Sequence, residues 1–537
     1  MARIKVTNTA IIVEDYIFNE CVELEDYFSR YDPVIHKKVY FGLYYDKEFR
    51  RLYLPAGMDL WFVRNKLHEK YYDRILNHPY QDIPNLLMMT PPRDNEQVQA
   101  LQFCCGIGDY HDNYTRYQLS LNLNTGKGKT YTSIATIAFF KIRSIIITAS
   151  TNLLDQWRER ILEYTNLKNK EIINISGASM CNMIILKKSR RIDEGCIFLC
   201  THKTLQSYGS TYGWDRVGEL FKALGIGIKI FDEAHENFQN IMMVDYFTNV
   251  YKTMYVTATA GRSEKKENYI FNISLKNVPF IDLWDENDDP RTHYIAVKYN
   301  SNPTPQQISR CKNKYGLDII RYVDYITKNE EFYKMLRIIT AEWILKCKGK
   351  TLIYIRTNEA ILRVYYWLAT NFNELLGDIG IFTSLIDKDR KNAEKDKRVI
   401  LTTIKSAGAG QDIKDLKLTI VLAEPFKSDI IARQTLGRTR DYNTIYIDIV
   451  DLGFRYTKKF YYEKLRTFNK YALDVSDSTL TKNELDSRSR VIENERLDWR
   501  PNLLVLDDKR FDFTGIKKEE SGPTKLVTFI EKEPAML

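Results

Sequence analysis

Residues 117–130 constrain the fold of this chain more than any other stretch, because an apolar strand pattern runs there into a glycine-rich turn that ends in Gly-Lys-Thr. Glycines let backbone N–H groups approach a polyphosphate with no Cβ in the way, and the helix that follows offers its positive end to the anion. The pattern predicts a phosphate-binding loop between a strand and a helix. The strict eight-residue pattern has glycine first, where Leu123 stands here. A chance turn in a lysine-rich chain is the alternative.

The residues of this loop are predicted to bind different parts of a nucleotide. Lys129 is expected to reach the outer phosphates of ATP, and the hydroxyl of Thr130 is expected to hold Mg²⁺. The backbone of the loop is expected to surround the phosphates. The predicted nucleotide contacts are Thr125, Gly126, Lys127, Gly128, Lys129 and Thr130.

A second apolar strand, within residues 226–231, ends in two adjacent carboxylates, Asp232 and Glu233. Open α/β sheets bind their ligands at the carboxyl ends of the strands. Neighbouring residues of a strand point in opposite directions, so the two carboxylates can serve different purposes. Asp232 is predicted to bind the Mg²⁺ shared with Thr130, and Glu233 to orient and deprotonate the attacking water.

A glutamine shortly before a phosphate loop can pair with adenine through its two-sided amide. Gln97 is the candidate and Gln99 the substitute, in a stretch that follows Pro91-Pro92 and is expected to open a helix. An ordinary exposed glutamine on a helix is the competing interpretation.

Composition limits the classes of protein to consider. At 537 residues the chain is long enough for about three domains. No apolar run approaches the length of a membrane span, and the start lacks the apolar core of a signal peptide. Eight cysteines are too sparse for a disulfide scaffold, which indicates a reducing compartment. The net charge of +9 permits a polyanionic partner without requiring one.

Four motifs follow one another in the first half of the chain: Thr-Gly-x-Gly-Lys-Thr at 125–130, Leu-x-x-Gln-Trp at 153–157, Asp-Glu-Ala-His at 232–235 and Thr-Ala-Thr-x-x-Arg at 257–262. In this order they resemble a superfamily 2 helicase. Within that group the chain is similar to the DEAH-box helicases of large DNA viruses and phages, including the poxvirus transcript-release helicase and phage branch-migrating helicases. The family usually has proline where Ala260 stands here.

The second half resembles the other lobe of such a motor. Residues 399–412 match the fifth motif of the family, which implies that Gly410 and Asp412 line the nucleotide cleft. Residues 434–440 resemble the sixth motif, whose arginines neutralise charge on the γ-phosphate. The usual pattern ends in arginine where Asp441 stands, with arginine one residue early. Arg438 therefore carries over directly, and Arg440 is the better candidate for the arginine finger.

The expected fold is α/β, with two RecA-like parallel-sheet P-loop domains in tandem and the ATP site in the cleft between them. We divide the chain into an N-terminal α+β accessory domain at 1–90, a first RecA-like lobe at 91–290, a second at 291–475 and a C-terminal extension at 476–537. The aromatic strands of the accessory domain are either core or a nucleic-acid contact. Residues 455–471, a basic and tyrosine-rich helix candidate, either touch nucleic acid or pack on the second lobe.

The leading function is an ATP-driven helicase or translocase on DNA, in preference to RNA, and on forked or branched structures. The first alternative is a motor that releases a transcript from a polymerase complex. The second is a scaffold that binds nucleic acid without hydrolysing ATP. Expected partners are nucleic acid and a polymerase or a replication or recombination protein, with no membrane. The expected location is the cytoplasm, that of the host if the protein comes from a virus or phage.

Overall fold

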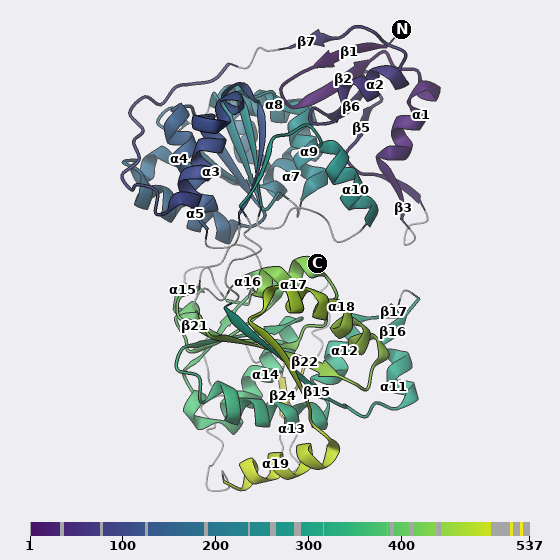
Figure 1. Cartoon of the computed structure of the whole chain (residues 1–537), viewed down its shortest axis with the longest axis vertical. Coiled ribbons are helices and arrows are strands. Elements are labelled where there is room, and N and C mark those ends of the chain that lie inside the picture. The colour runs from purple at the N-terminus through teal and green to yellow at the C-terminus, as the bar shows by residue number, and fades with distance from the viewer. Residues whose placement is uncertain are drawn as a thin grey trace. The chain divides into compact units, whose positions relative to one another are not determined.

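The computed structural model describes most of the chain. The described residues are 2–32, 37–75, 79–123, 127–186, 192–234, 237–257, 265–283, 291–314, 316–383, 385–386, 391–407, 413–436, 438, 442–495, 516–518 and 527–529. The chain divides into two compact units, Met1–Asp285 and Glu286–Leu537. Figure 1 shows the elements of both, in purple to teal for the first unit and teal to yellow for the second.

The first unit is built on a parallel sheet. In the described part of the chain this sheet has seven strands in the order β10-β11-β9-β12-β13-β8-β14. The central strands are apolar along their whole length because both faces are covered, as parallel sheets require. Their bounds are β8 (Gln118–Asn122), β9 (Ser144–Thr148), β10 (Ile172–Ile175), β11 (Ile197–Thr201), β12 (Ile228–Asp232), β13 (Lys252–Thr257) and β14 (Phe280–Asp282).

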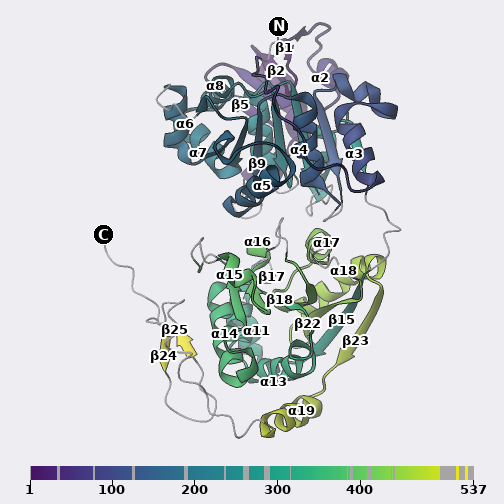
Figure 2. The same ribbon diagram turned by 90° about the vertical axis from the view of Figure 1, so that its left-hand side faces the viewer.

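Helices cover the two faces of this sheet in separate layers (Figures 1 and 2). On one face, α3 (Asn95–Cys105), α4 (Lys129–Phe140) and α5 (Thr151–Tyr164) form a core with strand residues such as Ile146 and Ile230. On the other face, strand residues such as Ile147 and Phe231 pack under α6 (Gly177–Ile185), α7 (His202–Tyr212), α8 (Trp214–Leu224), α9 (Phe238–Phe247) and α10 (Lys265–Ser274).

A smaller, mixed sheet precedes this lobe in sequence and shares its core. Its strand order is β5-β6-β2-β1-β7, with antiparallel pairing except for the parallel pair β1 and β7. Val13, Leu52 and Leu54 belong to the same apolar cluster as Phe238 and Phe231 of the lobe. The elements are β1 (Arg3–Val6), β2 (Ala10–Glu14), α1 (Phe18–Tyr27), β3 (Ser29–Asp32), β4 (Lys37–Tyr40), β5 (Tyr44–Asp46), β6 (Arg51–Pro55), α2 (Leu60–Lys66) and β7 (Asp73–Arg74).

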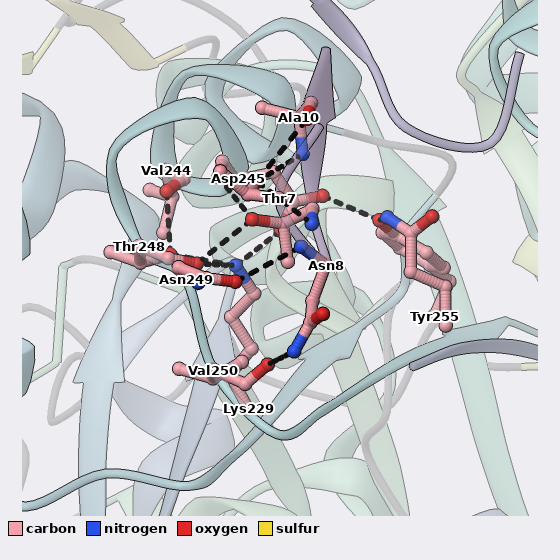
Figure 3. A network of polar contacts seen from close by, with 12 residues as sticks. Thr7, Asn8, Ala10, Lys229, Val244, Asp245, Thr248, Asn249, Val250 and Tyr255 are labelled. Carbon is pink, nitrogen blue, oxygen red and sulfur yellow. Dashed lines mark hydrogen bonds and ion pairs between the residues drawn. The ribbon is translucent and has the colours of Figure 1, made fainter. Parts of the chain in front are cut away.

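Polar contacts fasten this N-terminal sheet to the lobe (Figure 3). The Thr9 hydroxyl donates to the carbonyls of Asp245, at 2.8 Å, and Thr248, at 3.1 Å. The Asn8 side chain donates to the carbonyl of Val250 at 2.9 Å. We call residues 7–10 the N-terminal latch. The latch seats the N-terminal sheet on the turn that follows α9.

The same turn encloses a buried ion pair on the strand that ends in the two carboxylates (Figure 3). Lys229 Nζ of β12 lies 2.5 Å from Asp245 Oδ1, and both side chains are almost fully buried. Tyr255 Oη donates to Asp245 Oδ2 at 2.5 Å, and Gln118 Nε2 donates to Tyr255 Oη at 2.7 Å. Polar contacts thus run across β12, β13 and β8 to the N-terminal latch.

The second unit has the same plan. In its described residues the sheet has seven parallel strands in the order β19-β20-β18-β21-β22-β15-β23. The bounds are β15 (Thr292–Tyr299), β18 (Lys350–Ile355), β19 (Ile379–Phe382), β20 (Val399–Thr402), β21 (Leu416–Ala423), β22 (Thr444–Asp451) and β23 (Asp474–Thr479). Two short antiparallel hairpins pair β16 (Lys312–Asn313) with β17 (Gly316–Leu317) and β24 (Ile516–Lys518) with β25 (Val527–Phe529).

Two helix layers cover this sheet as well (Figure 2). One core cluster includes α12 (Ile319–Ile326), α13 (Glu330–Ile339), α14 (Asn358–Asn371) and α19 (Lys482–Asn494), and the other includes α17 (Asp429–Leu436) and α18 (Arg455–Tyr471). Arg337 of α13 donates to Ser489 of α19 at 2.9 Å. The remaining helices are α11 (Pro305–Arg310), α15 (Lys391–Lys395) and α16 (Ile404–Ala407).

The structure confirms the expected fold class: two parallel-sheet α/β lobes in tandem with an N-terminal α+β part. The aromatic run 37–45 holds two strands, β4 and β5, and Gly42 turns the backbone between them with a φ of +84°. Strand β23 belongs to the second sheet, so this lobe continues past residue 475.

Candidate active site

The described part of the phosphate-loop stretch joins β8 to α4, as the sequence predicts. The loop starts where Leu123 N donates to the carbonyl of Thr257 at 3.1 Å, and Gly128 precedes the first turn of α4. Gly128 has a φ of +95°, a left-handed conformation that a side chain strains. Thr125 and Gly126 lie outside the described residues. Lys127, Gly128, Lys129 and Thr130 are described at the helix N-terminus.

Gln97 lies against this loop. A Cβ on Gly128 would collide with the side-chain amide of Gln97, so the glycine makes room for the close approach. Gln97 is only 4% exposed, and its Oε1 accepts from the backbone N–H of Arg93 at 2.8 Å. Gln99 is exposed and donates to Tyr110 Oη at 3.0 Å. Of the two candidates, Gln97 is the one beside the loop. Because its side chain is buried, the interpretation of Gln97 as an ordinary exposed glutamine on a helix is excluded.

Lys127 is held at the side of the loop. Its Nζ lies 3.1 Å from Glu96 Oε1, on the first turn of α3. The two side chains are 17% and 38% exposed, so solvent screens this ion pair. The contact ties the loop to the helix that carries Gln97.

Glu233, which directly follows β12, contacts the loop lysine. Lys129 Nζ lies 3.1 Å from Glu233 Oε1, and the side chains are 14% and 7% exposed. Glu233 has a φ of +51°, an uncommon backbone conformation for a residue with a side chain. The structure therefore brings together the residues that the sequence assigned to the phosphates and to the attacking water.

Trp157 of α5 is the last residue of the Leu-x-x-Gln-Trp motif, to which the sequence assigned no role at the site. Its indole Nε1–H donates to Asp232 Oδ2 at 2.8 Å, and both side chains are buried. The helix follows β9, the strand paired beside β12, which explains how it reaches the carboxylate. The Leu-x-x-Gln-Trp stretch was the sequence signal that could have indicated this contact, because its tryptophan lies in the helix that follows β9.

Burial dominates the electrostatics of Asp232. Desolvation, followed by the negative charge of Glu233, raises the pKa of Asp232 to about 6, while Lys129 and the hydrogen bond from Trp157 lower it. A nearby cation favours the charged form of a buried carboxylate. The site thus holds an excess of buried negative charge beside the loop.

These residues fit a nucleotide with a divalent cation. Gly128 precedes the N-terminus of α4, where backbone N–H groups are free of helix partners and can bind phosphate oxygens. The Asp232 carboxylate and the Thr130 hydroxyl are hard oxygen donors of the kind that Mg²⁺ prefers. Among the described residues, no cluster of three or more histidine, cysteine, aspartate or glutamate side chains forms a separate metal centre.

Arg438 is the described arginine of the second-unit motif. It follows α17, where its N–H donates to the carbonyl of Thr435 at 3.4 Å, and it is 7% exposed. Burial raises the pKa of Tyr354 on β18 to about 12, and the positive charge of Arg438 acts against that rise. Gly410, Asp412 and Arg440 lie outside the described residues.

Arg356 and Glu424 form a further ion pair in the second unit, which the sequence analysis did not identify. Arg356 Nη1 lies 2.9 Å from Glu424 Oε1, directly after β18 and β21. Glu424 is 2% exposed. The pair lies at the carboxyl ends of two central strands of this sheet.

In the described parts of the chain, no helix is both long enough and apolar enough to cross a membrane.

Comparison with known proteins gives one family model and several relatives. Residues 93–262 match the model of the Type III restriction enzyme res subunit. The putative ATP-dependent RNA helicase L396 of Acanthamoeba polyphaga mimivirus is 22% identical over 458 residues, which cover 80% of this chain and 78% of the relative. The putative helicase 161L of Invertebrate iridescent virus 6 is 24% identical over 369 residues, which cover 65% of this chain and 75% of the relative.

One relative over a shorter stretch and two solved structures are also similar to this chain. The DNA 3'-5' helicase XPB of Kineococcus radiotolerans is 26% identical over 151 residues, 28% of this chain and 25% of the relative. The crystal structure of T4 UvsW aligns with 89% of this chain and 99% of its own at 12% identity, with a TM-score of 0.33. The structure of S. cerevisiae Dbp5 bound to RNA and ADP BeF3 aligns with 74% of this chain and 93% of its own at 13% identity, with a TM-score of 0.49.

The ordered motifs, the two parallel-sheet lobes and the helicase relatives agree with one another. The chain is an ATP-hydrolysing enzyme that is similar to helicases.

Proposed function

We propose that this enzyme uses ATP hydrolysis to move along DNA and to act on forked or branched structures. The observation that carries the proposal is the contact between Lys129 and Glu233 beside the buried Asp232, at the carboxyl end of the parallel sheet. A lysine from a glycine-containing loop and two carboxylates at the end of another strand of the same sheet are the parts that phosphoryl transfer to water needs.

Each residue has a proposed role in the reaction. Lys129 binds the outer phosphates, and Glu233 orients the attacking water and takes up its proton. Thr130 and Asp232 would hold Mg²⁺, which supplies positive charge to the phosphate oxygens when bound. Gln97 binds the adenine, with Lys127 and the loop backbone around the phosphates.

The ion pair between Lys129 and Glu233 suits a resting state of this site. Two opposite charges 3.1 Å apart, with side chains 14% and 7% exposed, keep each other in place. When phosphates take over Lys129, Glu233 is released to face the water. Nucleotide binding thereby prepares the general base at the moment when it is needed.

The second unit contributes the remaining groups of the proposed mechanism. Arg438 and Arg440 neutralise charge on the γ-phosphate, and Gly410 and Asp412 contact the nucleotide.

We also propose the domain boundaries inferred from the sequence. Segment 1–90 is an accessory domain, 91–290 and 291–475 are the motor lobes, and 476–537 is an extension. The second lobe extends through β23.

DNA is the proposed substrate because the relative with the highest identity quoted above is a DNA helicase. Release of a transcript from a polymerase complex is the second candidate, because the relative that covers most of this chain is named as an RNA helicase. A polymerase or a replication or recombination protein is the proposed protein partner. The two viral relatives favour a cytoplasmic location in a host cell.

The test compares ATP turnover by the full chain with duplex DNA, forked DNA, single-stranded DNA and RNA of equal length. We expect the largest stimulation, about tenfold or more, with forked DNA. Lys129→Ala is the control, and it should lose turnover with every nucleic acid because the phosphate cation is gone. Stimulation by RNA alone would favour the second candidate. Turnover that is the same with and without nucleic acid would contradict both candidate functions. Absence of turnover under every condition would favour the scaffold role.

A further inference from the structure

We infer that Trp157 is a positioning residue for the metal-binding carboxylate of Asp232, an inference that rests on the proposed function. The indole Nε1–H donates to Asp232 Oδ2 at 2.8 Å. The two residues are 75 positions apart in sequence, so the contact depends on the packing of α5 against β9, the strand that pairs with β12. The roles assigned from sequence leave this hydrogen bond unexplained.

The surroundings of Trp157 make it a rigid donor. The side chain is 3% exposed and packs with Leu153 and Ile161 of the same helix in the apolar core. An indole N–H only donates, so it cannot exchange roles with the carboxylate as a hydroxyl can. The ring therefore holds one oxygen of Asp232 in a fixed direction.

The acceptor is equally constrained. Asp232 is 8% exposed, and it also accepts a hydrogen bond from the backbone N–H of Glu233. A buried carboxylate without such donors would turn toward any available cation, including Lys129. With the indole on Oδ2, the carboxylate keeps a defined orientation for a divalent cation, in the way that outer-shell partners orient metal ligands.

A purely structural role makes a different prediction. If Trp157 only fills space in the core, replacement by phenylalanine should affect folding and nucleotide binding equally with and without metal. If its N–H positions Asp232, the same replacement should weaken the contribution of the metal alone. The ratio of nucleotide affinities with and without Mg²⁺ separates the two.

The experiment measures binding of a fluorescent, non-hydrolysable ATP analogue to the full chain in Mg²⁺ and in EDTA. For Trp157→Phe we expect the strengthening by Mg²⁺ to fall about tenfold, the lower end of the range for outer-shell partners of metal ligands. Affinity in EDTA should stay within twofold of the wild type. Trp214→Phe makes the same chemical change in the same unit, where Trp214 contacts the ring of Phe247, and should leave both affinities unchanged.

A second variant covers the case in which Trp157→Phe does not fold. Benzothienylalanine at position 157 keeps the bicyclic ring and removes only the N–H, and the same tenfold loss is expected. An unchanged effect of Mg²⁺ in either folded variant would overturn the role of Trp157 and leave the proposed function standing. Equal weakening in Mg²⁺ and EDTA would also overturn it. A wild-type chain whose nucleotide binding does not respond to Mg²⁺ would overturn the proposed site and this inference together.

Discussion

The backbone at Glu233 is unusual for a residue that bears a side chain. Its φ of +51° lies in the left-handed region, which costs on the order of 1 kcal/mol relative to ordinary backbone conformations. The next residue is fixed by a hydrogen bond from Ala234 N to the carbonyl of Val256 at 3.0 Å. The turn thereby directs the carboxylate of Glu233 toward Lys129 instead of continuing the alternation of the strand.

Glu233→Gln tests the proposed base. The amide has nearly the same shape but cannot take up a proton, so ATP turnover should fall about 10²-fold or more. Nucleotide affinity should be retained or increased, since Lys129 loses a competing negative charge. Steady-state turnover and analogue binding measure the two effects. Brisk hydrolysis by this variant would exclude Glu233 as the base.

His202 gives a residue-scale prediction for acid stability. The ring is buried, stacks on Phe231 and lies 3.2 Å from the side-chain nitrogen of Asn240. Burial lowers the pKa of His202 to about 3. Below its ordinary pKa of 6.5 the unfolded chain takes up a proton that the folded chain does not, so stability falls as the pH drops from about 6.5 toward 3.

At pH 5 this single group should cost about 2 kcal/mol, from 1.36 kcal/mol per pKa unit. His202→Asn keeps a hydrogen-bond acceptor for Asn240 and removes the titration. Calorimetric unfolding of wild type and variant at pH 7 and pH 5 gives the comparison. The variant should show a smaller loss between the two pH values, and an identical loss would contradict the assignment.

At the scale of elements, β12 depends on contacts from two directions. Asp232 and Glu233 lie at its carboxyl end. Its first half carries Lys229, whose ion-pair partner Asp245 belongs to α9. Burial lowers the pKa of Lys229 and raises that of Asp245, so each side chain needs the other to stay charged. The N-terminal latch closes over the same turn.

Lys229→Met should destabilise the first unit by about 3–5 kcal/mol, because it leaves the buried Asp245 carboxylate without its cation. Denaturant unfolding measures this loss, and hydrogen exchange should show reduced protection at the backbone N–H of Asn8. The double variant Lys229→Met with Asp245→Asn should recover part of the stability, since neither charge then remains. A double variant as unstable as the sum of both singles would contradict this account.

The elements that the sequence predicts well are those with local signals. The strand before the loop, the helix after it and the strand that ends in two carboxylates all follow from apolar runs and glycines within about ten residues. The helix expected at 455–471 is α18 with those bounds. The contacts of Trp157 and of Lys229 were not predictable in this way. Their partners lie 75 and 16 residues away, and the residues next to Trp157 and Lys229 in sequence do not indicate which side chains they contact.

At the scale of the molecule, the two units repeat one plan with different additions. Each has a parallel sheet between two helix layers, but the N-terminal sheet shares its core with the first and α19 packs on the second. The sequence indicates both lobes through the order of motifs. It could not show that β23 joins the second sheet, because that strand is polar and mostly exposed, as an edge strand often is.

Binding to nucleic acid should depend steeply on salt. Affinity that comes mainly from phosphate contacts falls as counterions compete, and the net charge of +9 is compatible with such contacts. Fluorescence anisotropy with forked and duplex DNA of several sequences, from about 50 to 200 mM salt, is expected to show a loss of about 10³-fold or more if six or more phosphates are contacted. A flat salt profile, or strong sequence preference, would contradict backbone recognition.

The N-terminal latch also has a consequence for how the chain is made. Thr9 bonds to the carbonyls of Asp245 and Thr248, which lie 236 and 239 positions later in the chain. Asn8 bonds to the carbonyl of Val250, 242 positions later. At ribosomal speeds of about 5–20 residues per second, the first strands emerge roughly 12–50 s before the turn that receives them. During that interval Val13, Leu52 and Leu54 have no finished core to enter. Nascent chains of this protein should therefore need chaperone protection until residue 250 has left the exit tunnel.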